Sequence, residues 1–122
     1  MKILVAEDDR VILMDIADML EELGHETLKA VSGEDALLAF GDGTGIDLMM
    51  IDLTLPGMSG AELAAEISRR APRMPIIICS GSDDIAGSEL GKYGRLEKPF
   101  AGRGLAAAIH SVTSMGESVP SH

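Results

Sequence analysis

The sequence predicts an α/β fold, a doubly wound (βα)5 arrangement in which a five-stranded parallel sheet carries helices on both faces. Short apolar runs of strand length alternate along the chain with longer segments whose apolar residues recur at helical spacing. Such alternation implies parallel strands joined by helices that cross the sheet. The 122 residues contain no repeat and no linker, so we expect one domain.

The amino-terminal elements are a strand, a helix and a second strand. "KILVA" (2–6) is an apolar run of strand length. Residues 11–23 carry apolar side chains at helical spacing, and Gly24 follows where helices commonly end. "HETLKA" (25–30) alternates between polar and apolar residues, as a half-buried strand does.

The middle of the chain repeats this pattern. Ser32 is a typical N-cap residue and opens a second helix, which the turn at 41–45 ends. "IDLMMID" (46–52) is the third strand. Ser59 and Glu62 have the spacing of a capping box, which predicts the start of a third helix.

The last third supplies two more strands and two helices. "PIIICS" (75–80) is the fourth strand, and we expect a weak fourth helix over about 83–90. "YGRLE" (93–97) is the fifth strand, and the fifth helix begins at Ala101. The first, third and fourth strands are the most apolar and are expected at the centre of the sheet. We expect the domain to span 1–115, followed by a flexible tail over 116–122.

Composition excludes several classes of partner. The net charge of −10 would repel nucleic-acid phosphates, and only 2% of residues are aromatic. No apolar stretch approaches the ~20 residues of a membrane helix, and the amino terminus lacks a signal-peptide pattern. We therefore expect a cytoplasmic protein that binds neither nucleic acid nor membrane. The single cysteine, Cys79, excludes an internal disulfide and is expected in the core.

Acidic and other polar residues stand where the predicted strands end. Glu7 and Asp8 follow the first strand, Asp52 ends the third, Ser80 ends the fourth and Lys98 follows the fifth. Because the carboxyl ends of parallel strands meet at one edge of the sheet, these side chains are expected in one crevice.

The chemistry of this crevice predicts a metal site. Crowded carboxylates repel each other and resist ionising together unless cations neutralise them. Oxygen ligands suit Mg²⁺, whereas the three histidines form no zinc pattern. A carboxylate beside Mg²⁺, a lysine and a hydroxyl can attack a phosphoryl group and hold it as an acyl phosphate.

Four segments carry a family resemblance. "ILVAEDD", "MMIDLTLPGMSG", "IIICSG" and "LEKPF" occur in this order at fitting separations. With them, residues 1 to about 115 resemble the response-regulator receiver domain of two-component signalling, in its single-domain, chemotaxis-regulator-like form. The resemblance implies a flavodoxin-like sheet with strand order 2-1-3-4-5.

The resemblance also implies roles for individual residues. Asp52 would be the phosphoacceptor, and Mg²⁺ (or Mn²⁺) would be bound by Asp8, by Asp52, by the backbone carbonyl of Thr54 and by Glu7 through water. Ser80 would be the hydroxyl that moves to the phosphoryl group.

Three further positions follow from the same resemblance. Lys98 would pair with the phosphoryl group, and a cis peptide bond is expected between Lys98 and Pro99. Pro56 and Gly57 would shape the loop after the acceptor.

The implied function is that of a phosphorelay receiver. A histidine kinase or a histidine phosphotransfer protein would donate the phosphoryl group, and phosphorylation would switch binding of an output partner that the sequence does not identify. We expect no enzyme with a separate substrate, although the domain would catalyse its own phosphoryl transfer and slow autodephosphorylation. Because the chain ends soon after the last predicted helix, we expect a stand-alone domain; origin in a hybrid kinase or a larger regulator is the alternative.

Two features depart from the family pattern. Arg95 stands where the family usually has an aromatic switch residue, and Tyr93 lies two positions too early to replace it. The interval from Ser80 to Lys98 is short, and three glycines lie near its predicted helix, which we therefore expect to be short or mobile.

Three other functions were weighed. A haloacid-dehalogenase-type phosphohydrolase needs an acid two residues after its nucleophile, where this chain has Thr54. A dinucleotide-binding module needs its glycine-rich turn after a strand, whereas "GDGTG" (41–45) precedes one. A receiver that docks without phosphorylation is the third, and the set Asp8, Asp52, Ser80 and Lys98 argues against it.

Overall fold

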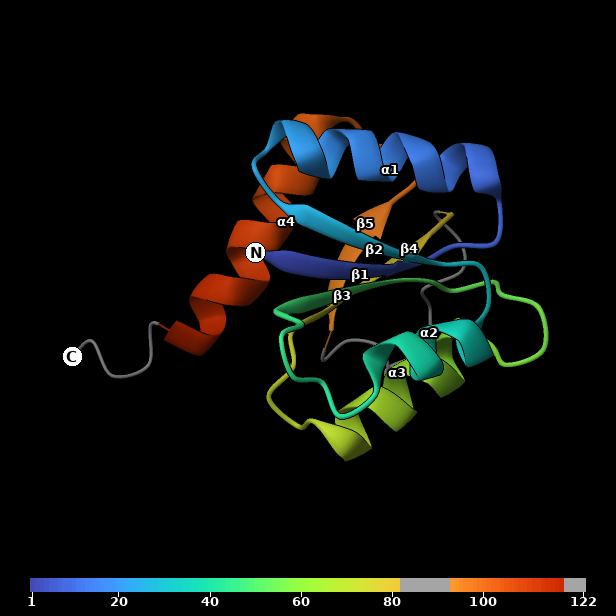
Figure 1. Ribbon diagram of the computed structural model, residues 1–122. Helices are drawn as coiled ribbons and strands as arrows, with labels where there is room; N and C mark the ends of the chain where they lie inside the picture. The colour runs from blue at the N-terminus through green and yellow to red at the C-terminus, as the bar shows by residue number, and fades with distance from the viewer. Residues whose placement is uncertain (82–92, 118–122) are drawn as a thin grey trace.

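The computed structural model describes residues 1–81 and 93–117, with side chains placed to residue 113. Strands and helices alternate through these residues (Figure 1). The strands are β1 (Lys2–Ala6), β2 (Glu26–Ala30), β3 (Leu48–Asp52), β4 (Ile76–Ser80) and β5 (Gly94–Glu97). The helices are α1 (Arg10–Glu22), α2 (Gly33–Phe40), α3 (Gly60–Arg70) and α4 (Gly102–Glu117).

The five strands form one parallel sheet in the order β2-β1-β3-β4-β5. This confirms the predicted fold class and strand order. All residues of β3 and β4 are buried, which agrees with their central positions and their apolar sequences. Ala6 pairs with Ile51, and Asp52 pairs with Cys79, so β1, β3 and β4 end at the same edge.

Successive side chains of each strand point to opposite faces of the sheet and contribute to two separate hydrophobic cores. One core lies under α2 and α3 and the other under α1 and α4, so the helices cover both faces of the sheet (Figure 1). The first contains Leu4, Ile51 and Ile78 from the sheet, and the second contains Val5, Met50 and Ile77. The strands therefore cannot shift by one residue without exposing both apolar sets.

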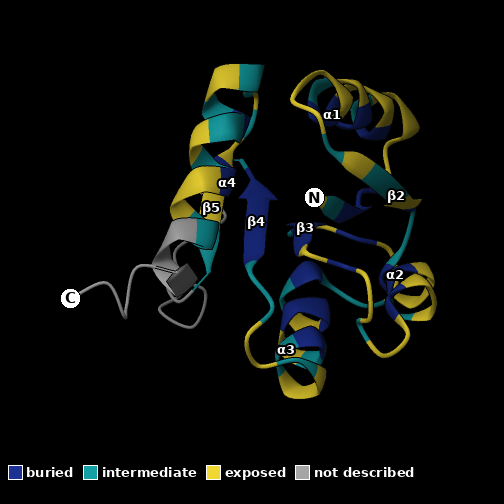
Figure 2. Ribbon diagram, turned by 60° about the vertical axis from the view of Figure 1, so that its left-hand side comes forward, coloured by how far each residue is buried: buried dark blue, intermediate teal, exposed yellow. Residues whose placement is uncertain are grey.

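Burial follows the amphipathic pattern of each helix (Figure 2). In α1, Leu13, Ile16 and Leu20 face the sheet and are at most 4% exposed, as their spacing predicts. Each such side chain contributes about 1.5–3 kcal/mol by leaving water.

Side-chain caps fix where the helices begin. Asp9 accepts hydrogen bonds from the backbone N–H groups of Val11 and Ile12 at the start of α1. Ser32 caps α2, and Ser59 and Glu62 form the predicted capping box at α3.

A close approach between α3 and β3 requires a glycine. A Cβ atom on Gly60 would lie 2.2 Å from the carbonyl oxygen of Asp52 and 2.6 Å from the Cα of Leu53. The N–H of Gly60 also donates to the carbonyl of Leu53 at 2.9 Å. The start of α3 is thereby packed directly against the end of β3.

Some predicted boundaries differ from those observed. β3 begins at Leu48, because the N–H of Ile46 still bonds the turn carbonyl of Gly43. α4 continues to Glu117, two residues beyond the predicted end of the domain at residue 115. The predicted helix at 83–90 and residues 118–122 lie outside the described residues. Within residues 1–81 and 93–117, no helix has the length and apolar character needed to span a membrane.

Candidate functional site

Three carboxylates converge at the carboxyl edge of the sheet. Glu7 and Asp8 follow β1, and Asp52 is the last residue of the adjacent β3. One oxygen from each of the three can be chosen so that all lie within 4.8 Å of one another. Glu7 is 2% exposed and Asp52 is 7% exposed, whereas Asp8 faces solvent. The parallel pairing of β1 and β3 is what brings these acids together.

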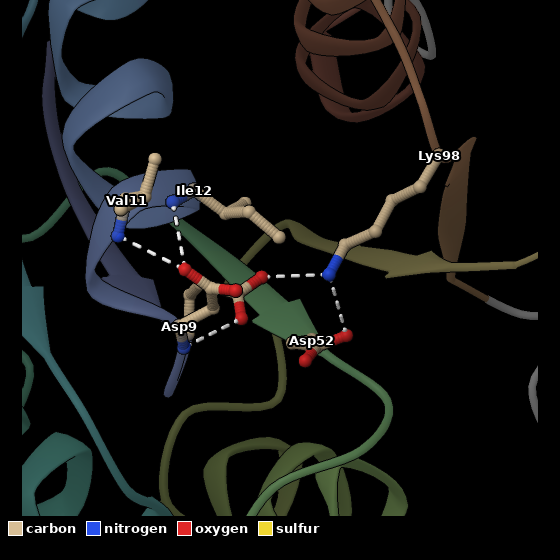
Figure 3. Close-up of polar contacts among 6 residues, drawn as sticks. Asp9, Val11, Ile12, Asp52 and Lys98 are labelled. Carbon is tan, nitrogen blue, oxygen red and sulfur yellow. Dashed lines mark hydrogen bonds and ion pairs between the residues drawn. The ribbon is translucent and has the colours of Figure 1, made fainter.

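Lys98 directly follows β5, and its side chain contacts the acidic cluster. Its Nζ lies 3.2 Å from Oδ1 of Asp52 (Figure 3). The same Nζ lies 2.7 Å from Oε1 of Glu7, so one ammonium group contacts both buried acids. The N–H of Lys98 donates to the carbonyl of Ser80 at 2.8 Å, which ties the turn after β5 to the end of β4. The peptide bond between Lys98 and Pro99 is cis, as predicted.

One ammonium group does not offset the negative charge of three carboxylates. Burial and the charge of Glu7 raise the pKa of Asp52 to about 6, although Lys98 opposes this shift. Burial disfavours the charged form of Lys98, but its hydrogen bond to Glu7 and the nearby Asp52 outweigh burial and raise its pKa. A further cation would therefore be stabilised at this edge.

Ser80 and Thr54 lie beside the acids. Ser80 is buried at the end of β4, one residue beyond the partner of Asp52, and its hydroxyl donates to the Gly81 carbonyl at 3.1 Å. Thr54 is exposed, and a hydrogen bond from its backbone lowers the pKa of Asp52 slightly against the larger upward shift. Gly57 in the following loop has a φ of +72°, a conformation that suits glycine.

The structure thus brings Glu7, Asp8, Asp52 and Lys98 into one cluster, with Ser80 and the Thr54 backbone on its border. Two contacts were not predicted from the sequence. Glu7 forms the shorter ion pair with Lys98, and its Oε2 accepts the N–H of Asp9 at 3.0 Å.

Gly60 is a supporting residue that the sequence analysis did not single out. Its lack of a side chain lets the start of α3 pack against the backbone of Asp52, and its N–H donates to the carbonyl of Leu53. Its position at the start of a capped helix is visible in the sequence, but the close approach of α3 to β3 is not.

Arg95, which stands where the family usually has an aromatic residue, and the nearby Tyr93 have different surroundings. Arg95 is exposed on β5. The Tyr93 hydroxyl lies 3.3 Å from the Ser68 hydroxyl of α3, a hydrogen-bonding distance.

Cys79 is buried, as expected, and burial raises the pKa of its thiol to about 12, so the thiol stays protonated.

The donor set fits a hard dication. All candidate ligands are oxygens, two acids are buried and one is open to water, and the negative charge exceeds that of the single lysine. Mg²⁺ is bound in proteins by few carboxylates and keeps several waters, which matches this half-open cluster. Asp52 is held at the end of a buried strand, and a carboxylate in such a position can act as a nucleophile.

The structure defines the class of domain: a doubly wound parallel α/β sheet with three carboxylates and a lysine at its carboxyl edge. Over residues 3–110 the sequence matches the family described as "Response regulator receiver domain". The chain belongs to this family, which confirms the resemblance noted from its motifs. Receiver domains use Mg²⁺ at an acidic pocket, and Glu7, Asp8 and Asp52 form an acidic group that could hold a metal ion.

Named relatives and solved structures agree with this family assignment. The sensory transduction protein RegX3 of Mycobacterium tuberculosis is 32% identical over 118 residues, which cover 93% of this chain and 51% of that protein. The transcriptional regulatory protein AfsQ1 of Streptomyces coelicolor is 35% identical over 119 residues, covering 94% and 52%. This chain therefore spans about half the length of these curated relatives.

Two crystal structures show the same fold. A response regulator receiver domain protein from Clostridium thermocellum superposes with a TM-score of 0.87 at 31% identity, covering 97% of this chain and 98% of that one. The response regulator TrrA from Thermotoga maritima, in complex with Mg²⁺–BeF, gives 0.83 at 28% identity, covering 91% and 97%.

Proposed function

We propose that this receiver domain accepts a phosphoryl group on Asp52 and thereby switches its binding to a partner. The observation that carries the proposal is the convergence of Glu7, Asp8 and Asp52 within 4.8 Å, with the Lys98 ammonium 3.2 Å from Asp52. Nothing in a purely structural role requires three acids to share one crevice, because their mutual repulsion destabilises the fold.

The proposed donor is a phosphohistidine on a histidine kinase or a histidine phosphotransfer protein. A carboxylate oxygen of Asp52 attacks phosphorus, the bond between phosphorus and the imidazole nitrogen breaks, and its electron pair stays on the imidazole. The product is an acyl phosphate on Asp52. Lys98 would pair with a phosphoryl oxygen, and the contact of its Nζ with Oδ1 of Asp52 supports this role.

The residues that would hold Mg²⁺, or Mn²⁺, are Asp8, Asp52, the Thr54 carbonyl and, through water, Glu7. The bound ion would neutralise the acids and the charge on the transferring oxygens. The raised pKa of Asp52 supports this assignment, because burial and the charge of Glu7 disfavour the charged carboxylate and Lys98 does not offset them.

Ser80 supplies the proposed switch. Its hydroxyl donates to the adjacent Gly81 carbonyl, a local bond that rotation about one side-chain torsion can exchange for a phosphoryl oxygen. Arg95, exposed on β5, carries a charged head that does not favour burial, so we propose that the signal leaves this domain without an inward aromatic side chain.

In this proposal the chain acts in the cytoplasm and is not an enzyme with a separate substrate. Its chemistry is its own phosphorylation and a slow autodephosphorylation. Response regulators work with kinases and output domains.

Phosphate-affinity electrophoresis after incubation with acetyl phosphate tests the proposal. The wild-type chain should shift only when Mg²⁺ is present, and Asp52→Asn should not shift. Asp18→Asn, which removes an exposed acid of α1 away from the cluster, is the matched control and should shift like wild type. An unshifted wild-type chain, with acetyl phosphate and with a phosphorylated phosphotransfer protein, would indicate a docking-only receiver.

A further inference from the structure

A second hollow lies at the opposite end of the sheet from the acidic cluster. It has a volume of about 860 Å³ and is formed where β4 and β5 begin, between the last turn of α3, the loop that follows it and the carboxyl-terminal half of α4. In Figure 2 this end is the foot of the β4 arrow. Pockets that bind small molecules typically have ~300–1,000 Å³, so the hollow is of suitable size.

The walls combine apolar surface with a few hydroxyl groups. Pro72, Met74 and Val112 supply apolar surface, and Ile76 is buried in the floor. The Ser68 and Tyr93 hydroxyls lie 3.3 Å apart within the lining. One wall is fixed because α4 packs closely on β5: a Cβ on Gly94 would lie 2.3 Å from Cγ1 of Val112.

The charge around this hollow is the reverse of that at the acidic edge. Four of the ten basic residues of the chain lie in α3, in the loop after it or at the start of β5: Arg69, Arg70, Arg73 and Arg95. Glu66 pairs with Arg69 and Arg70, the latter at 2.8 Å.

The remaining two arginines are uncompensated. Among the described residues, neither Arg73 nor Arg95 forms an ion pair or a side-chain hydrogen bond. Arg95 lines the hollow itself, and Arg73 lines an adjoining hollow of about 530 Å³ that shares Pro72, Met74 and Pro75 with the first. Unpaired guanidinium groups beside apolar walls are suited to carboxylates and phosphates, which they bind through two parallel hydrogen bonds.

We propose that this hollow is a second binding site, for a small organic anion in which a carboxylate or phosphate is carried on an apolar ring. The anion contacts Arg95, and the ring packs against Met74, Pro72 and Val112. The hydroxyls of Ser68 and Ser111 on the lining offer further hydrogen bonds. Binding here does not depend on phosphorylation of Asp52, because the two sites lie at opposite ends of the strands.

Titration followed by backbone amide chemical shifts tests the proposal, with benzoate and phenyl phosphate as probes and inorganic phosphate as the ringless comparison. At least one of the two ring-bearing probes should give saturable, millimolar-range shifts at Gly94, Arg95 and Ser111. Inorganic phosphate should bind more weakly. The two probes distinguish a carboxylate site from a phosphate site.

Variants distinguish a specific binding site from nonspecific electrostatic attraction of anions. Arg95→Gln should weaken binding about fivefold, the effect of losing one partly solvated charged hydrogen bond. Ser111→Asp places an acid on the exposed rim and should weaken it at least as much. Arg103→Gln removes an exposed arginine at the far end of α4 and should leave binding unchanged. Absence of saturable shifts at the hollow with both ring-bearing probes, or equal weakening by Arg103→Gln, would overturn the proposal.

Discussion

Replacing Asp52 by Asn should stabilise the metal-free domain, and the size of the gain can be worked from the structure. Asp52 carries a pKa of about 6 in the folded chain against 3.8 as its ordinary value, because burial and Glu7 disfavour its charge. A difference of about two units corresponds to about 3 kcal/mol. Since water partly screens the mouth of the crevice, we expect about half of this, on the order of 1–2 kcal/mol. Asn keeps an oxygen that can accept from Lys98, so the substitution removes charge with little change of shape.

The gain should depend on pH in a defined direction. A carboxyl group whose pKa is raised in the folded state stabilises that state fully at pH values below its ordinary pKa, where it is protonated in both the folded and the unfolded chain. This stabilisation is lost as pH rises through the folded-state pKa. The advantage of Asn should therefore be complete above about pH 6 and shrink toward zero as pH falls to about 4.

Urea unfolding in EDTA, at several pH values from 8 downward, measures this difference for wild type and Asp52→Asn. Asp18→Asn serves as the exposed-acid control and should change stability by less than ~0.5 kcal/mol. If Asp52→Asn is less stable than wild type at pH 8 without metal, or if its gain grows as pH falls, the repulsion argument is refuted.

The remaining predictions concern the support of the site and its metal. Gly60→Ala should cost more than about 2 kcal/mol by forcing the new methyl group against the Asp52 carbonyl, whereas Gly102→Ala, with nothing within 4 Å, should be neutral or stabilising in thermal unfolding. Adding Mg²⁺ should raise the Tm of wild type in a concentration-dependent manner, and Asp8→Asn should reduce that rise; an equal rise in both would remove Asp8 from the ligand set. Lys98→Met should cost about 3 kcal/mol in urea unfolding by leaving the buried Glu7 unpaired, and adding Glu7→Gln should restore most of it; additive losses would show that the two side chains are not coupled.

The sequence predicted the fold and the location of the site because both follow from patterns among residues that are close in the sequence. An apolar strand ending in a polar residue, as at Asp52, is visible in the sequence, and parallel strands must end at a common edge. The N-caps Ser32 and Ser59 could be assigned because a cap acts within three residues of itself.

The contacts that the sequence did not predict depend on side-chain direction and on close backbone approach. Glu7 pairs directly with Lys98, 91 residues away, and only the twist and register of the sheet determine that its carboxylate points there. The role of Gly60 depends on the distance between α3 and β3, which no local pattern encodes. The hollow beside Arg95 likewise arises from four segments that meet only in the folded chain.

The central claim is that Asp52 takes the phosphoryl group within an oxygen site that needs a divalent cation. Borohydride reduction of the phosphorylated chain, followed by peptide mass spectrometry, measures this directly, because reduction converts an aspartyl phosphate to homoserine at the modified residue. We expect homoserine at position 52 with Mg²⁺ and none in EDTA. Reduction product at another position, or equal product at position 52 without a divalent cation, would contradict it.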